Sequence, residues 1–292
     1  MDHVKLIFQR FNRTMPEINK GQADVLANCE VLFNDWGTAP GMWIEHHSKV
    51  YIFLPGVPTE MKNLMTFRVL PKLQGFQVDE RVLNSYILTV GIGESHLAEH
   101  IADIENDFPE CVHLAYLPKI GLVRLRLTVT GKDLQVMTRE VEKWKKRLVQ
   151  RIGSAVVATQ DVSFEEVIVQ SFLEKQVTLG IAESCTGGNI SKVITEIPGC
   201  SRMFQGSVVA YANQTKEHVL GVNPQTLIHH GAVSEEVVTE MAIAAKKKLN
   251  ADYAIATSGI AGPEGGSAEK PVGTVWIAVA GKNEVKTKPF HF

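Results

Sequence analysis

The sequence predicts an α/β protein built from several domains, and three observations support this. A chain of 292 residues with 45% hydrophobic and 21% charged residues has ordinary globular composition, and one core is not expected to hold all of it. Apolar runs of strand length alternate with stretches of helical periodicity. Loops rich in glycine and proline separate them. We therefore predict three parts, over residues 1–72, 73–153 and 159–292.

Charge and cysteine usage exclude several classes of protein. The net charge is −2 and the basic residues are spread along the chain, so neither nucleic acid nor an anionic membrane is expected as the main partner. The N-terminus has no apolar region behind a basic start, and no apolar stretch is long enough to span a bilayer. The four cysteines show no CxxC spacing, so neither a disulfide framework nor a zinc site is predicted. We expect a cytoplasmic protein that contacts no membrane and binds no metal.

The first predicted part, residues 1–72, is rich in loops. Prolines and glycines interrupt its short apolar runs, among them Val50–Leu54, which is typical of a strand. We expect this part to be a small α/β domain.

The second part, residues 73–153, has the pattern of a small α+β module. Its periodicities follow the order strand, helix, two strands and helix. The predicted elements are Val82–Val90, Glu94–Asn106, Val112–Tyr116, Leu122–Val129 and Leu134–Arg151. Period-two alternation in the last strand places Arg124 and Arg126 on its outer face. These arginines could contact phosphates, but a solvated strand face is the favoured interpretation.

The third part, residues 159–292, begins with a predicted helix near Ser163–Glu174 that starts with a capping box. A short strand, Val177–Ala182, then runs into the sequence Glu183-Ser184-Cys185-Thr186-Gly187-Gly188 and a helical stretch, Asn189–Glu196. Such a strand–turn–helix unit presents backbone N–H groups and the positive end of the helix to a developing oxyanion or a phosphate.

Ser184 has two interpretations. A serine just before a helix is most often an N-cap whose hydroxyl accepts a backbone N–H. The alternative is a nucleophile, and the segment Val208–Lys216 favours it, because a predicted strand there delivers Tyr211 and Lys216 close together. A desolvated lysine can take the proton of a serine hydroxyl, and Ser–Lys is a recurring nucleophile and base pair. Spacing alone leaves open that Lys216 is a solvated helix residue.

A glycine-rich loop follows the predicted buried strand Ala251–Thr257. Four glycines between Ser258 and Gly266 allow the backbone to approach a ligand such as a sugar phosphate, although such a loop can also be a flexible connector. In open α/β sheets the ligand lies beyond the carboxyl ends of the strands, so this loop and the Ser184 turn are expected to meet. A strand at Gly273–Ala280 and a covering helix at Glu235–Leu249 complete the predicted domain.

Four ordered motifs in the third part resemble the C-terminal amidase domain of the CinA family, also called competence/damage-inducible protein A. They are Ala182-Glu183-Ser184-Cys185-Thr186-Gly187-Gly188, Tyr211-Ala212-Asn213-Gln214-Thr215-Lys216, His230-Gly231-Ala232-Val233-Ser234 and Ser258-Gly259-Ile260-Ala261-Gly262-Pro263. The resemblance implies hydrolysis of the carboxamide of nicotinamide mononucleotide to nicotinic acid mononucleotide and ammonia, in pyridine nucleotide recycling. It implies no metal or organic cofactor.

The same resemblance implies roles for single residues. Ser184 is implied as the nucleophile, Lys216 as the general base, and Tyr211 as a hydrogen-bonding partner in the site. Thr186, Gly187 and Gly188 are implied to contact the substrate, with the two glycines as oxyanion donors. The loop residues implied to hold the ribose phosphate are Ser258, Gly259, Gly262 and Glu264.

The other two parts are similar to the same family. Met15–Asn19, Gly37–Gly41 and Leu54–Met61 resemble the second half of its first domain, which is like molybdopterin-binding domains of the MoaB and MogA type. In the family that domain is associated with ADP-ribose pyrophosphatase activity, and Glu60 would lie at its pocket. Residues 82–150 resemble the KH-like middle domain. Gly91-Ile92-Gly93-Glu94 lacks the Gly-x-x-Gly spacing that clamps a nucleic acid backbone, so RNA binding is not expected.

Two departures from the family pattern shape the expectations. The first domain lacks the family's opening strand and glycine-rich phosphate motif, so no pyrophosphatase activity is expected from it. The chain stops at Phe292, before the family's Gly-Asp-Arg segment and the closing helix that carries an arginine of the active site. Three alternatives to the amidase therefore stay open: a nucleotide-binding module without catalysis, an interaction protein linked to DNA uptake or recombination, and a remnant of an ADP-ribose pyrophosphatase in the N-terminal domain. Family members form dimers, so a homodimer is expected.

Overall fold

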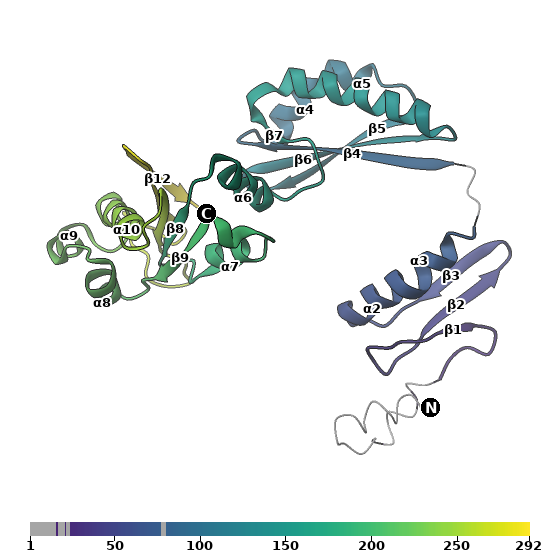
Figure 1. The fold of residues 1–292 in the computed structure, drawn as a ribbon, viewed down its shortest axis with the longest axis horizontal. Helices are drawn as coiled ribbons and strands as arrows, with labels where there is room; N and C mark the ends of the chain where they lie inside the picture. The colour runs from purple at the N-terminus through teal and green to yellow at the C-terminus, as the bar shows by residue number, and fades with distance from the viewer. Residues whose placement is uncertain (1–15, 17–20, 22–23, 77–79) are drawn as a thin grey trace. The chain divides into compact units, whose positions relative to one another are not determined.

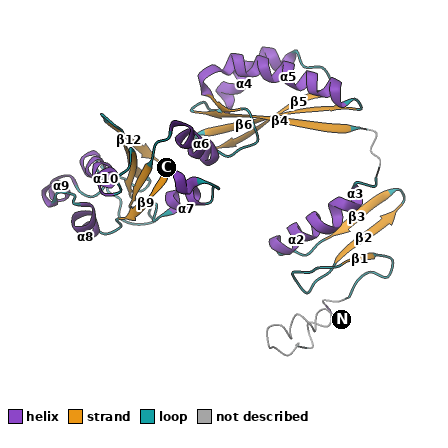
Figure 2. Cartoon of the chain, in the orientation of Figure 1, coloured by secondary structure: helices purple, strands orange, loops and turns teal. Residues whose placement is uncertain are grey.

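The computed structural model describes residues 16, 21, 24–76 and 80–292 (Figure 1). Of the motifs named above, Met15–Asn19 lies outside the described residues except for Pro16. The chain divides at Arg81–Val82 into two compact units. Both contain helices and strands, which confirms the predicted α/β class (Figure 2).

The first unit holds a three-stranded antiparallel sheet in the order β1-β2-β3. Its strands are β1 (Glu30–Leu32), β2 (Gly41–His46) and β3 (Lys49–Phe53). A continuous helical stretch follows, made of α2 (Pro58–Leu64), the π-helical η2 (Met65–Val69) and α3 (Leu70–Leu73). The buried residues of its core are Leu32, Trp43, Leu64 and Val69. Strand β3 confirms the strand predicted over Val50–Leu54.

The second unit begins with the small α+β module that the sequence predicts. Its elements are β4 (Arg81–Val90), α4 (Glu94–Asn106), β5 (Val112–Lys119), β6 (Leu122–Gly131), α5 (Leu134–Ile152), η3 (Gly153–Ala155) and β7 (Val156–Ala158). The sheet order is β5-β6-β4-β7, and the two helices lie over one face of the sheet (Figure 1). Strand β7, which the sequence analysis does not predict, pairs with the end of β4.

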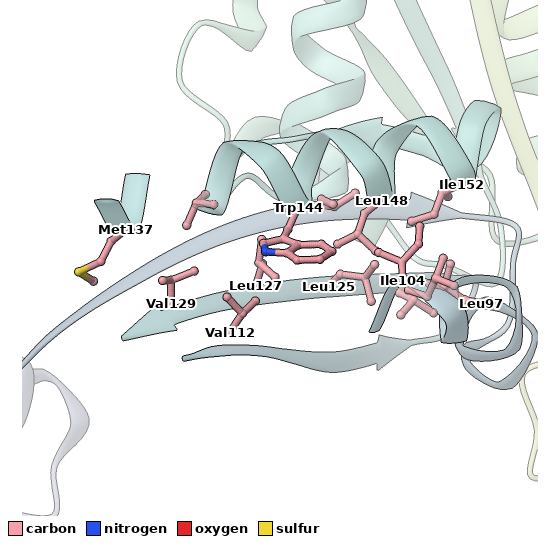
Figure 3. Packing of buried hydrophobic residues seen from close by; sticks show 14 residues of the cluster. Leu97, Ile104, Val112, Leu125, Leu127, Val129, Met137, Trp144, Leu148 and Ile152 are labelled. Atoms are coloured by element: carbon pink, nitrogen blue, oxygen red, sulfur yellow. The ribbon is translucent and has the colours of Figure 1, made fainter. Parts of the chain in front are cut away.

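One hydrophobic core fills the space between this sheet and its helices (Figure 3). Leu125 and Leu127 of β6 point into it, and Trp144 of α5 packs over them. Successive side chains of a strand point to opposite faces. Arg124 and Arg126 therefore lie on the face of the sheet away from this core, as their alternation predicts.

The C-terminal domain contains a five-stranded sheet in the order β12-β11-β10-β8-β9. Strands β8 (Leu179–Glu183), β9 (Phe204–Val209) and β10 (Tyr253–Gly259) are parallel, while β11 (Thr274–Ala280) and β12 (Val285–His291) extend it by antiparallel pairing. The helical elements are α6 (Phe164–Lys175), α7 (Asn189–Thr195), η4 (Cys200–Arg202), α8 (Asn213–Thr215), the π-helical η5 (Lys216–Leu220), α9 (Pro224–His230) and α10 (Glu235–Lys248). The predicted capping box is present at Ser163, the N-cap of α6.

Alternation along the central strands builds the two faces of this sheet. On one face, alanines such as Ala182, Ala254 and Ala256 pack in one cluster with α10, and their small side chains let the helix lie close. On the other face, Leu179 and Ile181 pack in one cluster with residues of α6 and α7. The sheet is thus a central layer between helices, and the carboxyl ends of β8, β9 and β10 open at one edge.

Candidate active site

Three segments that follow parallel strands meet at this edge of the C-terminal sheet. Ser184 comes directly after β8, residues 210–216 follow β9, and the glycine-rich loop follows Gly259 at the end of β10. The Ser184 N–H donates to Thr257 O at 3.0 Å, which fixes the turn to β10. A cavity of about 300 Å³ lies among them. Its lining residues are Ser184, Cys185, Tyr211, Asn213, Lys216, Ala232, Val233, Ser258, Gly259, Ile260, Ala261, Gly262, Glu264 and Gly265.

Ser184 and Lys216 form a buried pair in this cavity. Lys216 Nζ lies 3.0 Å from Ser184 Oγ, and the two residues are only 1% and 7% exposed, respectively. Nζ also donates to Ala210 O at 2.8 Å and to Tyr211 O at 3.0 Å. The N-cap of α7 is Gly188, so Ser184 does not cap that helix. The structure therefore brings together the serine and the lysine that the sequence analysis paired.

The two carbonyl contacts decide what a neutral Lys216 can do. Carbonyl oxygens only accept hydrogen bonds, so an amine gives its two N–H groups to Ala210 O and Tyr211 O. Its lone pair then faces Ser184 Oγ and can accept the hydroxyl proton. Burial lowers the pKa of Lys216 from its ordinary 10.5, and only the neighbouring Cys185 acts in the opposite direction. Both geometry and burial thus suit Lys216 to take a proton from Ser184.

Tyr211 contributes to the site through its backbone as well as its side chain. Its carbonyl is one of the acceptors that fix Lys216 Nζ. The residue is 71% exposed and lines the cavity, so the phenol stands at the rim, where it can contact a ligand that enters.

The N–H groups of Gly187 and Gly188 are already engaged. Gly187 N–H donates to Ser184 O at 3.0 Å, and Gly188 N–H donates to Glu183 Oε2 at 3.0 Å. Neither glycine lines the cavity. This corrects the expectation that they supply oxyanion donors. The carboxylate of Glu183, which the sequence analysis did not single out, occupies the N-terminus of α7 instead.

Thr186 also lies behind the turn and not in the cavity wall. Its hydroxyl is 2.9 Å from the hydroxyl of Thr257. Thr186 therefore links the turn to β10, which differs from the substrate contact expected of it.

The loop residues expected to bind substrate all line the cavity, namely Ser258, Gly259, Gly262 and Glu264. Ser258 is 1% exposed, and its hydroxyl donates to Ala232 O at 2.7 Å, so this side chain holds the cavity wall together. At Gly259 an added Cβ would lie 2.7 Å from Val275 Cγ2 and 3.0 Å from Cys185 Sγ. Glycine is therefore required there by close packing.

Cys185 and Asn213 are cavity residues with functional side chains that were not predicted as site residues, although they stand inside the quoted motifs. Cys185 follows the serine directly, and burial raises the pKa of its thiol, although the backbone N–H groups of Cys185 and Thr186 act to lower it. Asn213 begins α8 and lines the cavity three residues before Lys216. Their position next to the serine and the lysine was the signal available in the sequence.

The remaining described residues contain no comparable cluster of metal-binding side chains. No group of three or more histidine, cysteine, aspartate or glutamate residues there could hold a metal ion. A larger cavity of about 540 Å³ is lined only by residues between 156 and 174, and no lysine, histidine or cysteine is among them. Within the part of the chain that the structure describes, no helix is long and apolar enough to cross a membrane.

The fold and the site define an α/β domain with a buried serine–lysine pair at the carboxyl ends of parallel strands. Residues 161–292 match the CinA C-terminal domain, and residues 84–158 match the damage-inducible protein CinA KH domain. A CinA-like protein of Flavobacterium psychrophilum is 43% identical over 99% of this chain and 70% of its own length. Another, from Cytophaga hutchinsonii, is 42% identical over 98% of this chain and 68% of its own length. The chain belongs to the CinA family.

Solved structures include proteins that are similar to part of this chain. The crystal structure of the competence/damage inducible protein CihA from Agrobacterium tumefaciens is 40% identical, with a TM-score of 0.43. The similarity covers 44% of this chain and 78% of that one.

Proposed function

We propose that the C-terminal domain is an amidase that hydrolyses the carboxamide of nicotinamide mononucleotide, giving nicotinic acid mononucleotide and ammonia. The observation that carries this proposal is the buried pair in which Lys216 Nζ, held by two carbonyls, lies 3.0 Å from Ser184 Oγ. Membership of the CinA family supports it, because the pair lies within residues 161–292, which match the CinA C-terminal domain.

The proposed reaction uses Ser184 and Lys216 in sequence. Ser184 Oγ attacks the carboxamide carbon while its proton passes to Lys216 Nζ, which forms a tetrahedral intermediate. Lys216 then returns the proton to the departing nitrogen, so ammonia leaves and an ester to Ser184 remains. A water molecule attacks that ester and gives a proton to Lys216. Lys216 passes this proton to Ser184 Oγ as the ester bond breaks, so the carboxylic acid product leaves and Ser184 is restored.

The oxyanion of the intermediate requires N–H donors other than Gly187 and Gly188, which are engaged. Cys185, the residue after the nucleophile, lines the cavity. A donor from the residue after the nucleophile is a recurring arrangement in hydrolases. We assign the oxyanion contact to the backbone N–H of Cys185.

The glycine-rich loop supports a nucleotide as the substrate. Backbone N–H groups in such a loop can bind a phosphate. Glu264, on the same loop, lines the cavity, and a carboxylate is an acceptor suited to ribose hydroxyls and not to a phosphate. We therefore place the phosphate at the backbone of the loop and the ribose beside Glu264.

The test is ammonia release from nicotinamide mononucleotide by the 292-residue chain, beside its Ser184→Ala variant. We expect release by the parent chain and none above background by the variant, which lacks the nucleophile but keeps the cavity. Nucleotide binding, measured by calorimetry, should persist in the variant. Equal release by both chains would remove Ser184 as nucleophile, and binding without release by the parent would favour a nucleotide-binding module.

A further inference from the structure

Glu183 is a fully buried carboxylate at the end of β8, and the mechanism above does not use it. Its Oε2 accepts the N–H groups of Gly188 and Ile190, each at 3.0 Å. Its Oε1 accepts the N–H of Ser191 at 2.9 Å and the Ser191 hydroxyl at 2.5 Å. All four donors belong to the first residues of α7 or to the glycine before it.

These bonds hold Glu183 in its charged form. Burial by itself raises the pKa of a carboxyl group, but the hydrogen bonds from Ser191 and Ile190, together with the nearby Thr186 hydroxyl, outweigh it, and the pKa of Glu183 is lowered from 4.5. The positive end of a helix adds to this preference. The group is therefore a fixed negative charge and not a proton carrier at neutral pH.

The bonds also close the turn that carries the nucleophile. Residues 184–187 lie between Glu183 and the N–H groups that its side chain accepts, so the carboxylate ties the far end of the turn back to β8. The backbone of the same residue reaches the lysine, because Glu183 O accepts Ala210 N–H at 2.7 Å and Ala210 O accepts Lys216 Nζ at 2.8 Å. Glu183 thus connects to both members of the pair.

We propose that Glu183 is a positioning residue, whose buried carboxylate pins the turn after β8 to the start of α7 and thereby holds Ser184 Oγ within hydrogen-bonding distance of Lys216 Nζ. This inference rests on the proposed amidase function for its kinetic readout. Glu183 touches neither the cavity nor the reacting atoms.

The variant Glu183→Gln tests the inference at almost constant volume. In glutamine an NH₂ group replaces one carboxylate oxygen. This NH₂ group is a donor, and it would face the N–H and O–H donors that the oxygen accepts in the parent chain. The turn must then shift to relieve these contacts. A displacement of about 1 Å at a reacting group can cost about a hundredfold in rate. We expect kcat to fall by about 30-fold to 100-fold and KM to change by less than about twofold, because the walls of the cavity are built from other segments.

A second readout does not depend on the substrate. A fluorophosphonate reacts with an activated serine, forming a phosphorus–oxygen bond to Ser184 Oγ, expelling fluoride and passing the hydroxyl proton to Lys216. We expect slower labelling of the Glu183→Gln chain. The midpoint of its labelling pH profile should also lie nearer to 10.5, the ordinary pKa of lysine, because a displaced serine lets water reach Lys216 Nζ. Unchanged kcat, labelling rate and midpoint would overturn the inference.

Two further variants separate positioning from loss of stability. Ser191→Ala removes one of the four hydrogen bonds and should give a smaller loss of kcat in the same direction. Val169→Ala truncates a fully buried side chain of α6 and should destabilise the domain without moving the pH midpoint. The parent chain could release no ammonia while the fluorophosphonate labels the Glu183→Gln variant more slowly than the parent. In that case the proposed substrate is wrong and the positioning role stands. If Val169→Ala and Glu183→Gln shift the midpoint of the labelling pH profile equally, Glu183 has only a structural role.

Discussion

At the scale of single residues, the protonation state of Lys216 follows from what surrounds it. The ammonium form would be a charge buried at 1% exposure, and the three groups in contact with Nζ are neutral oxygens of Ala210, Tyr211 and Ser184. Removing a charge from water is costly unless an opposite charge compensates for it. This position therefore favours the neutral amine over the ammonium form. Because the two carbonyls accept its N–H groups, the lone pair of the amine is directed at the Ser184 hydroxyl.

Lys216→Ala should lower kcat for ammonia release by about a hundredfold or more, because it removes the amine that lies 3.0 Å from Ser184 Oγ. The measurement is steady-state kinetics with nicotinamide mononucleotide. Lys192→Ala is the matched control, since the side chain of Lys192 is 69% exposed and pairs with Glu196. An unchanged kcat in Lys216→Ala would place the base elsewhere.

The pH dependence of the parent chain should report the same lysine. kcat/KM should rise with pH along a limb whose midpoint lies below 10.5, because burial lowers the pKa of Lys216 and the neutral form is the base. Between that lowered pKa and 10.5 the unfolded chain binds more protons than the folded chain, so the free energy of unfolding should rise with pH in this window. Lys216→Met should remove that rise in urea titrations. A rise of equal size in the variant would contradict the assignment.

The sequence predicts part of this chemistry and misses another part. Ser184 and Lys216 could be paired because each follows a strand whose apolar pattern is readable, and parallel strands end at one edge. The engagement of Gly187 and Gly188 could not be predicted in this way. Gly187 N–H donates to Ser184 O within the turn, and Gly188 N–H donates to the Glu183 carboxylate across it. Both contacts depend on the tertiary geometry of the turn.

At the scale of elements, the sheet and its helices place these residues through close packing. Gly259→Ala should destabilise the C-terminal domain by about 1–3 kcal/mol, because the new Cβ would lie 2.7 Å from Val275 Cγ2 and 2.9 Å from Thr274 O. Denaturant unfolding measures this change. Gly281→Ala, in the turn between β11 and β12, is the control, since its Cβ would come no nearer than 3.5 Å to its neighbours. This variant should stay within about 0.5 kcal/mol of the parent. If both variants lose similar amounts of unfolding free energy, close packing at Gly259 is not the cause of its loss.

The elements themselves were predicted where their periodicity is strong. Helices α4, α5 and α10 and the strands β4, β6 and β8 agree with the patterns read from the sequence to within a few residues. Strand β12 was missed because Lys286, Lys288 and Pro289 break its apolar pattern, although charge and proline suit a strand at the edge of a sheet. Helix α9 was missed because its apolar content is low, and it begins at the Asn223 cap and Pro224.

At the scale of the whole molecule, hydrophobic burial is divided among separate cores. Each of the four clusters of buried residues stays within one part of the chain: the first unit, the α+β module, or one of the two faces of the C-terminal sheet. A domain with its own core can fold without its neighbours. Every residue of the candidate active site belongs to the second unit.

A chain shortened to residues 82–292 should therefore keep the proposed activity. We expect kcat/KM for ammonia release within about twofold of the full chain, because neither the serine–lysine pair nor the cavity draws on the first unit. The unfolding transition of the second unit should also be retained. The Ser184→Ala variant of the shortened chain controls for contaminating activity. A shortened chain that unfolds like the parent but releases ammonia more than tenfold more slowly would show that the first unit contributes to the site.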